Sequence, residues 1–219
     1  MTQEVKVLIG IGVLTVAILV GAVFFLSKSS PPISNSTPTA SMDPKLLIRE
    51  DSYKIATDSA KVTIVEFGDY QCPACRQAYP TVKRVIKDYS GKINFVFRNF
   101  PLPQHKNAQI SAEAAEAAGV QGKFWQMHDK LYENQDQWAE SDQPLDVFLN
   151  YATELSLDVT KFQTDVIDKR YIQKITQDQN DGDGLGINAT PTFFINQQKI
   201  EGVPSYDDFK NKIDSELAK

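Results

Sequence analysis

The longest apolar run of the chain lies near its N-terminus, at residues 7–26 (VLIGIGVLTVAILVGAVFFL), and contains no charged residue. With a rise of 1.5 Å per residue, a helix of about 20 residues crosses the ~30 Å hydrocarbon layer of a bilayer. The apolar part of a cleaved signal peptide is shorter, roughly 7–15 residues, and a small-x-small cleavage site follows it, which this sequence lacks. The pattern therefore predicts a retained single-pass transmembrane anchor over residues 1–26, with a cleaved signal peptide as the alternative.

A polar segment follows this run. Residues 27–41 are rich in Ser, Thr and Pro and have almost no large apolar side chains, so they cannot bury enough surface to fold. We interpret residues 27–43 as a flexible tether and residues 44–219 as one folded domain. Lys6 before the span favours a cytoplasmic N-terminus, which would place the folded domain outside the cytoplasm.

Apolar runs then predict a strand, a helix and a second strand. Residues 61–67 (KVTIVEF) are β-branched and aromatic, as in a buried strand. Apolar residues recur at helical spacing over 73–89, and Gly91 is a typical residue after a helix C-terminus. A second strand is predicted over 92–100, before Pro101. This order implies two parallel strands joined by a right-handed crossover.

The middle of the chain has a helical pattern. Residues 105–180 combine an Ala-rich segment (SAEAAEAA) with several stretches of apolar residues at helical spacing. Two or three helices would account for this pattern, and we expect a helical insertion over about residues 104–182. We interpret the glycine-rich sequence NDGDGLG (180–186) as a flexible exit loop.

Strand signals return near the C-terminus, at 190–196 and 198–202, with a tight hairpin expected at Asn196 although the usual glycine is missing. Residues 205–217 predict a closing amphipathic helix with Ser205 as its N-cap. The elements thus follow the order strand–helix–strand, helical insertion, strand–strand–helix. We expect an α/β domain.

Composition and charge exclude several classes of protein. The 219 residues carry a formal net charge of −5 and have no block of Lys or Arg, which argues against nucleic-acid binding. The chain contains two cysteines, Cys72 and Cys75, so it is not a scaffold held together by disulfides. We expect a monomer with neither a cofactor nor a resident metal.

The two cysteines form the sequence Cys72-Pro73-Ala74-Cys75, where the first predicted strand gives way to the first helix. At a helix N-terminus, the free backbone N–H groups and the helix dipole stabilise a thiolate on the first cysteine. Pro73 fits the first helical turn, where its missing N–H costs nothing. A lowered pKa makes Cys72 a good nucleophile and a good leaving group. Cys75, one turn later, would be the more buried, resolving thiol.

Half of a zinc site is the alternative for this motif. A structural zinc site needs four ligands, usually in two close pairs, and His105 and His128 are the histidines that could complete it. They lie in separate helical regions, so we favour a redox pair over zinc. These histidines and Trp125 are more often packing or surface residues than ligands or substrate contacts.

Glu66 and the Thr190-Pro191 pair are further candidates, each with an ordinary alternative. Glu66 shares a strand face with Ile64. If that strand is covered on both sides, burial would raise the pKa of the carboxyl and let it exchange protons with Cys75. The alternative is a solvent-facing glutamate at a sheet edge. The Thr190-Pro191 peptide could be cis, which would aim the Thr190 backbone across the sheet, or trans at the end of a loop.

Several stretches together resemble the DsbA-like branch of the thioredoxin superfamily. They are VTIVEFGDYQCPAC, FVFRNFPL followed by His105, AEAAEAA, QGKFWQMHDKLY and GINATPTFFIN. The resemblance spans residues 61–196 and covers nearly all of 44–219. It implies a thioredoxin-like fold with a helical insertion.

The resemblance also implies roles for the site residues. Cys72 would be the attacking, solvent-facing cysteine and Cys75 the resolving one. Glu66 would be the buried acid beside the pair. The substrate would contact four residues around Cys72, namely Pro73, Ala74, Thr190 and the cis-proline Pro191.

By the same resemblance, we expect an extracytoplasmic thiol–disulfide oxidoreductase at the cell membrane that introduces disulfides into secreted or surface proteins. A quinone-linked membrane partner, DsbB-like or VKOR-like, would reoxidise it. Ala74 stands where strong oxidants of the family often carry His, and a cationic His would help to hold the thiolate, so we expect a milder oxidant. The alternative is a membrane-tethered reductase or isomerase, for which Thr190 is also typical. The intact cysteine pair argues against a non-catalytic binding module.

Overall fold

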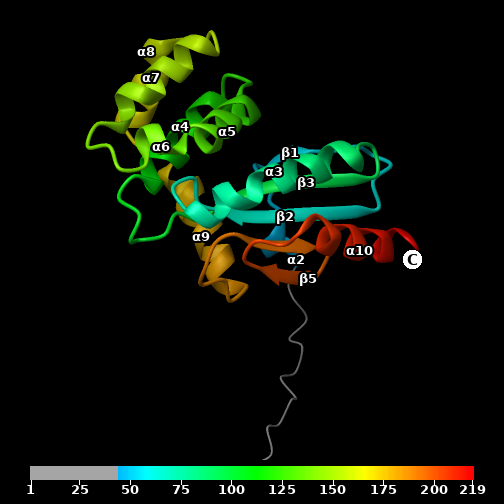
Figure 1. Ribbon diagram of the computed structural model, residues 1–219. Coiled ribbons are helices and arrows are strands. Elements are labelled where there is room, and N and C mark those ends of the chain that lie inside the picture. Colours follow the sequence, from blue (N-terminus) through cyan, green and yellow to red (C-terminus); the bar gives the residue numbers. More distant parts are fainter. Residues whose placement is uncertain (1–43) are drawn as a thin grey trace, which may run out of the picture. The chain divides into compact units, whose positions relative to one another are not determined.

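One mixed sheet of five strands organises the part of the chain that the computed structural model describes, residues 44–219 (Figure 1). The strand order is β1-β3-β2-β4-β5. The predicted anchor (1–26) and tether (27–43) lie outside the described residues. Within 44–219, no helix is both long enough and apolar enough to cross a membrane.

The predicted strand–helix–strand unit forms the centre of the sheet. β2 (Val62–Gly68) pairs in parallel with β3 (Ile93–Asn99), and α3 (Pro73–Asp88) connects them. On its other side β2 pairs with β4 (Thr192–Ile195), which in turn pairs with β5 (Gln198–Glu201), both in the antiparallel direction. β2 is therefore a central strand, which explains its nearly continuous apolar sequence.

The C-terminal strand–strand–helix unit is confirmed as well. Asn196, in the two-residue connection between β4 and β5, has a positive φ of 52°. Asn adopts this conformation more readily than most residues, so the hairpin closes without a glycine. α10 (Tyr206–Leu217) begins after its predicted N-cap Ser205, which forms a capping box with Asp208.

Two short elements before β2 have no clear signal in the sequence. α2 (Pro44–Leu47) has four residues and β1 (Tyr53–Ile55) has three. β1 pairs with β3 at the sheet edge and is partly exposed, so it lacks the apolar alternation of a longer strand. The Tyr53 ring stacks on Phe124, with 3.8 Å between the ring centroids. A contact with the helical insertion thus helps to fix this strand.

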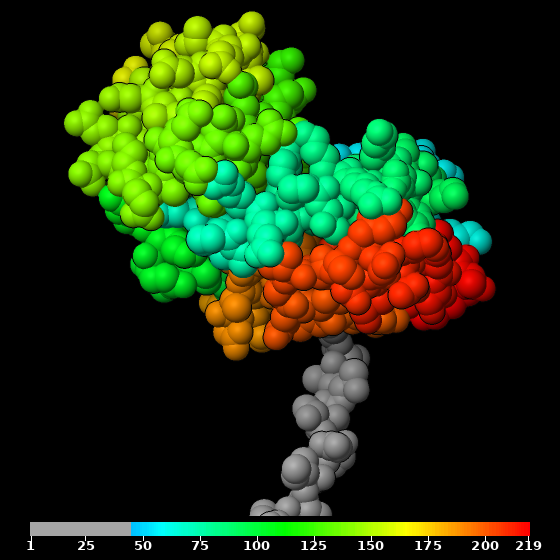
Figure 2. Space-filling view, in the orientation of Figure 1, coloured from blue at the N-terminus to red at the C-terminus, as the bar shows by residue number. Residues whose placement is uncertain are grey.

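The chain between β3 and β4 is mostly helical. Its helices are α4 (Ala108–Gly119), α5 (Phe124–Glu133), α6 (Gln135–Trp138), α7 (Pro144–Glu154), α8 (Val159–Ile167) and α9 (Ile172–Gly184). Helices α4 to α8 form a lobe to one side of the sheet, green to yellow in Figures 1 and 2. α4 packs against α5, α7, α8 and α9, and its buried alanines allow these helices to approach it closely.

Helices cover both faces of the sheet. On one face, α3 and α10 pack over Val62 and Ile64 of β2. On the other face, α2 and α9 lie over a smaller apolar cluster that includes Val65 and Phe67 of β2. Because β2 is covered on both faces, a polar side chain in it is removed from water.

The predicted exit loop at 180–186 is wrong over most of its length, because α9 continues to Gly184. Gly182 packs on the face of the sheet that α2 and α9 cover. A Cβ added to it would lie 2.6 Å from the Phe100 ring and 3.2 Å from Phe67. The glycine therefore allows close helix–sheet packing rather than flexibility. The preceding Asp181 is held by Arg98. These tertiary contacts outweigh the low helix propensity of glycine.

Arg98 of β3 forms the buried ionic centre of this face. Its side chain is 0% exposed, its Nε donates to Asp178 at 2.7 Å, and its Nη2 donates to Asp181 at 2.6 Å. Its Nη1 donates to the carbonyl oxygens of Leu46 and Leu47 at 3.0 and 2.9 Å. One guanidinium thus ties α9 and α2 to the sheet.

Replacing Asp178 with Ala should strongly destabilise the protein, because it leaves the buried Arg98 charge without its Nε partner. Breaking a buried pair on one side costs about 3–5 kcal/mol. Urea unfolding would measure this loss. The matched control is Asp51→Ala, because Asp51 pairs with Arg49 at the surface and such pairs contribute about 0–1 kcal/mol. Equal unfolding midpoints for the two variants would contradict this account.

Candidate active site

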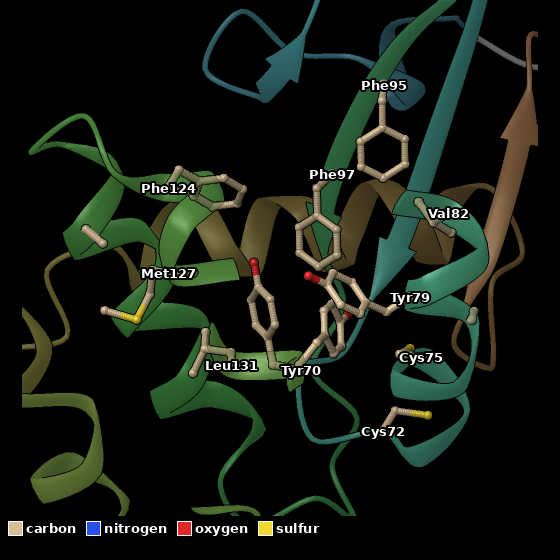
Figure 3. Packing of buried hydrophobic residues seen from close by; sticks show 14 of the residues in the cluster. Tyr70, Cys72, Cys75, Tyr79, Val82, Phe95, Phe97, Phe124, Met127 and Leu131 are labelled. Atoms are coloured by element: carbon tan, nitrogen blue, oxygen red, sulfur yellow. The ribbon is translucent and has the colours of Figure 1, made fainter. Parts of the chain in front are cut away.

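The two cysteines lie where β2 gives way to α3, as the sequence predicts. Cys72 is the N-cap residue of α3 and has an extended backbone (φ −67°, ψ 122°), and Pro73 occupies the first turn. The Cys72 N–H donates to the Asp69 carbonyl oxygen at 3.1 Å, which closes the turn between strand and helix. Figure 3 shows Cys72 and Cys75 on the first turn of α3, beside Tyr70 and Tyr79. The free N–H groups of this turn are therefore available to a negative charge on Cys72.

The surroundings of Cys72 favour its thiolate. Its pKa is lowered to about 5, first by a hydrogen bond from the Cys75 side chain, then by the Thr190 side chain and by the backbone N–H groups of Cys75 and Ala74, while burial opposes the shift. In the thiol form, its Sγ donates to the Thr190 carbonyl oxygen at 3.4 Å. Cys72 is 6% exposed, so it reaches the surface over a smaller area than the resemblance implied.

Cys75 has the opposite environment. It is 0% exposed, and its pKa is raised by burial, by its hydrogen bond to Cys72 and by the charges of Cys72 and Glu66. Two thiols in one helical turn thus differ sharply in acidity. At neutral pH this arrangement favours a thiolate on Cys72 and a thiol on Cys75.

Glu66 is buried, which decides against the edge glutamate that the sequence left open. It is 2% exposed in the central strand, and its register partners are Phe97 of β3 and Phe193 of β4. Burial raises the pKa of its carboxyl to about 8. A carboxyl with this pKa can both give and accept a proton near neutral pH.

The Thr190–Pro191 peptide bond is cis, as the family resemblance implied. Its Thr190 carbonyl faces the Cys72 sulfur. The Pro191 carbonyl oxygen accepts a hydrogen bond from the Gly202 N–H at 2.9 Å, which ties the start of β4 to the end of β5. The cysteine turn and the proline turn are therefore neighbours, although 118 residues separate Cys72 from Thr190.

Asp69 is a site residue that the sequence analysis missed. Its Oδ1 accepts from the Gln71 N–H at 2.7 Å, and its Oδ2 accepts from the Leu102 N–H at 2.9 Å and contacts Nδ1 of His105 at 2.6 Å. Burial raises the pKa of this carboxyl, and these hydrogen bonds oppose the shift. Asp69 joins the cysteine turn to the loop after β3. Its place directly after a buried strand was the available sequence signal.

Two glutamines fix the cysteine turn to the helical insertion. The Gln135 Nε2 group donates to the carbonyl oxygens of Tyr70 and Cys72, at 2.7 and 3.1 Å. The Gln71 side chain donates to the Ala139 carbonyl oxygen at 2.6 Å and accepts from the Asn107 N–H at 2.6 Å. No residue spacing in the sequence predicts these contacts, because each joins residues more than 30 positions apart.

The remaining candidates take no part in a metal cluster. His128 is 4% exposed, lies among aromatic rings and has its pKa lowered by burial. Trp125 packs edge-on against the same histidine, with 5.3 Å between the ring centroids. Among residues 44–219, no group of three or more His, Cys, Asp or Glu side chains is placed to hold a metal ion.

Sequence comparisons relate the chain to known proteins. The family model Thioredoxin_4, described as thioredoxin, matches residues 49–215. A probable disulfide bond formation protein D from Bacillus cereus is 34% identical over 172 residues, which cover 75% of this chain and 78% of that protein. A Na(+)/H(+) antiporter NhaA 1 from Salinispora arenicola is 42% identical over 144 residues, covering 65% of this chain and 21% of the antiporter. The chain thus matches about a fifth of the length of that relative.

Solved structures have the same architecture. Oxidised BdbD from Bacillus subtilis has a TM-score of 0.69 and 26% identity, with 77% of this chain and 94% of that chain covered. A thioredoxin-like oxidoreductase from Silicibacter pomeroyi also has a TM-score of 0.69 and 26% identity, with coverage of 81% and 99%. The family model and the Bacillus cereus relative each match most of the chain, so the chain belongs to the thioredoxin family and resembles its DsbA-like thiol–disulfide oxidoreductases.

Proposed function

We propose that this chain is an extracytoplasmic disulfide oxidase, which introduces disulfide bonds into secreted or surface proteins through Cys72 and Cys75. The observation that carries the proposal is the low pKa of the Cys72 thiol, about 5, beside a buried Cys75 whose pKa is raised. Stabilising a thiolate favours the reduced form of the pair, so the oxidised form readily accepts electrons.

The proposed reaction begins with the Cys72–Cys75 disulfide. A substrate thiolate attacks the Cys72 sulfur, forms a mixed disulfide and releases Cys75, which takes up a proton. A second substrate thiolate then attacks the substrate sulfur of the mixed disulfide, and Cys72 leaves as its stabilised thiolate. The substrate gains one disulfide, and the cysteine pair gains the two electrons.

Glu66 is the proposed proton donor and acceptor for Cys75. It is buried in the same core, and its charge raises the Cys75 pKa, so the two groups interact. With a pKa of about 8, the carboxyl can protonate Cys75 when it leaves the disulfide. It can deprotonate Cys75 during reoxidation, when Cys75 attacks the mixed disulfide between Cys72 and the membrane partner.

The proposed substrate contacts surround the Cys72 sulfur. The Thr190 carbonyl lies 3.4 Å from that sulfur, on the turn that contains Pro191. Pro73 and Ala74 follow Cys72 on the exposed end of α3. A substrate chain that reaches the sulfur must therefore pass these four residues.

The proposed location is the cell membrane, with the catalytic domain outside the cytoplasm and residues 7–26 as its anchor. The apolar sequence of that segment and the relative that is named a disulfide bond formation protein support this location. A DsbB-like or VKOR-like membrane protein would reoxidise the pair, and the chain would act as a monomer.

The reduction potential of the cysteine pair tests the direction of electron flow. The protein is equilibrated in glutathione buffers, and the reduced fraction is measured by thiol trapping. We expect about −120 to −180 mV, with Ala74→His more oxidising than the parent because a cation beside Cys72 would further stabilise its thiolate. Gln77→His, on the exposed part of the same helix, serves as the control. A parent value near that of thioredoxin, about −270 mV, would instead indicate a reductase.

The raised pKa of Glu66 should make Glu66→Gln more stable than the parent at high pH. Below about pH 4.3 the carboxyl is protonated in both the folded and unfolded parent. Between that pH and about 8, the unfolded chain loses the proton while the folded chain keeps it, so parent stability falls as pH rises.

Urea unfolding at pH 4 and pH 8 measures this effect. The free energy of unfolding of Glu66→Gln minus that of the parent should be roughly 4 kcal/mol larger at pH 8 than at pH 4. Glu50→Gln, at an exposed position, should show no such pH-dependent difference. The account is wrong if the difference between Glu66→Gln and the parent is the same at both pH values.

A further inference from the structure

Tyr132 of α5 reaches the place where the strand of Glu66 meets the helix of Cys75. Its hydroxyl would lie 3.0 Å from a Cβ added to Gly68, and Gly68 shares a face of β2 with Glu66, two residues earlier. Its ring packs on Tyr79, with 5.4 Å between the ring centroids. Tyr79 is one turn after Cys75 and so lies on the same face of α3. The hydroxyl thus lies on the face of β2 that carries Glu66, and its ring contacts the helix that carries Cys75.

This hydroxyl has no protein partner. Tyr132 is 1% exposed, and its oxygen makes no hydrogen bond to any part of the described chain. A buried tyrosine hydroxyl usually has a partner, since an unmade hydrogen bond is costly. Burial, and then the charges of Cys75 and Glu66, raise the pKa of Tyr132, so the hydroxyl remains a neutral donor.

We propose that Tyr132 is a positioning residue for the resolving step, in which its hydroxyl holds one internal water between the Glu66 carboxylate and the Cys75 thiol. In this step, Cys72 is held in a mixed disulfide with the partner that oxidises the pair. The Cys75 proton passes to the water while the water gives a proton to Glu66. The Cys75 thiolate then attacks the Cys72 sulfur, and the partner thiolate leaves. This inference rests on the proposed roles of Cys75 and Glu66.

The other titratable groups around the hydroxyl do not replace Glu66 as proton acceptor. Asp69 is already bonded to three donors, including His105. Tyr70 and Tyr79 both have raised pKa values, so they stay protonated. The ring of His128 lies 5.0 Å from that of Tyr132 between centroids, but burial lowers the pKa of His128, so it is a poor proton acceptor.

The test follows the two thiols separately in the full chain. Reduced protein is mixed with excess Ellman's reagent. The first released nitrothiobenzoate reports attack by Cys72 on the reagent, and the second reports attack by Cys75 on the resulting mixed disulfide. The rate of each phase is recorded against pH for the parent and for Tyr132→Phe, which keeps the ring and its packing.

We expect Tyr132→Phe to slow the second phase by about tenfold at neutral pH, because a hydrogen bond to an ionising group is lost. The pH of half-maximal rate should also rise, whereas the first phase should be unchanged. Tyr70→Phe is the matched control. It also removes a buried, unpartnered hydroxyl. Of the two groups that the water would join, the charge of Glu66 acts on Tyr70 and that of Cys75 is not among the main ones, so both phases should keep their pH profiles.

A second variant pair tests the dependence on Glu66. In a Glu66→Gln background, Tyr132→Phe should slow the second phase by much less than tenfold, because both changes interrupt one route. The inference is overturned if Tyr132→Phe leaves the second-phase pH profile unchanged, or if Tyr70→Phe alters it equally. If the first phase is slow and has an ordinary thiol pH profile in the parent, the proposed role of Cys72 fails instead, independently of Tyr132.

Discussion

Cys72 is the N-cap of helix α3, four residues after the buried strand β2 ends. This junction places two neighbouring thiols in different surroundings. Cys72 lies at the helix N-terminus, where the Cys75 side chain, the Thr190 side chain and backbone N–H groups stabilise its negative charge. Cys75 points into the core, where burial disfavours its negative charge. The chemistry proposed for the chain depends on this difference.

The helical insertion keeps that junction in place. Gln135 of α6 holds the carbonyl oxygens of Tyr70 and Cys72, and Gln71 bonds to the backbone at Asn107 and Ala139. The insertion also supplies Tyr132, whose ring packs on Tyr79 of α3. It therefore has two functions, because it covers the core and also sets the geometry around the reactive sulfur. On the opposite face of the sheet, Arg98 anchors α9 and α2.

The sequence predicted the elements whose formation depends mainly on residues close together in the chain. Apolar runs predicted β2 and β3, the chain order predicted that the two cysteines lie where β2 gives way to α3, and Ser205 predicted a helix start. The edge strand β1 was missed because three partly exposed residues carry no periodic signal. The end of α9 was predicted wrongly because glycines suggested a loop, whereas Gly182 is needed for contact with Phe100.

The polar groups that support the site were harder to predict. Asp69 and Gln135 act through partners 33 and 65 positions away, so their roles depend on the tertiary fold and leave no local pattern. Glu66 was an intermediate case. Its alternation in the strand was visible in the sequence, but its burial became certain only when both faces of β2 were found to be covered.

The pKa of the Cys72 thiol tests this account most directly. The rate of iodoacetamide alkylation of the reduced protein is measured against pH, with Cys75→Ala measured alongside. The account predicts a half-maximal rate near pH 5 for the parent and a higher value for Cys75→Ala, which lacks the hydrogen bond that contributes most to the shift. A parent value near that of an ordinary cysteine, about 8.5, would contradict it.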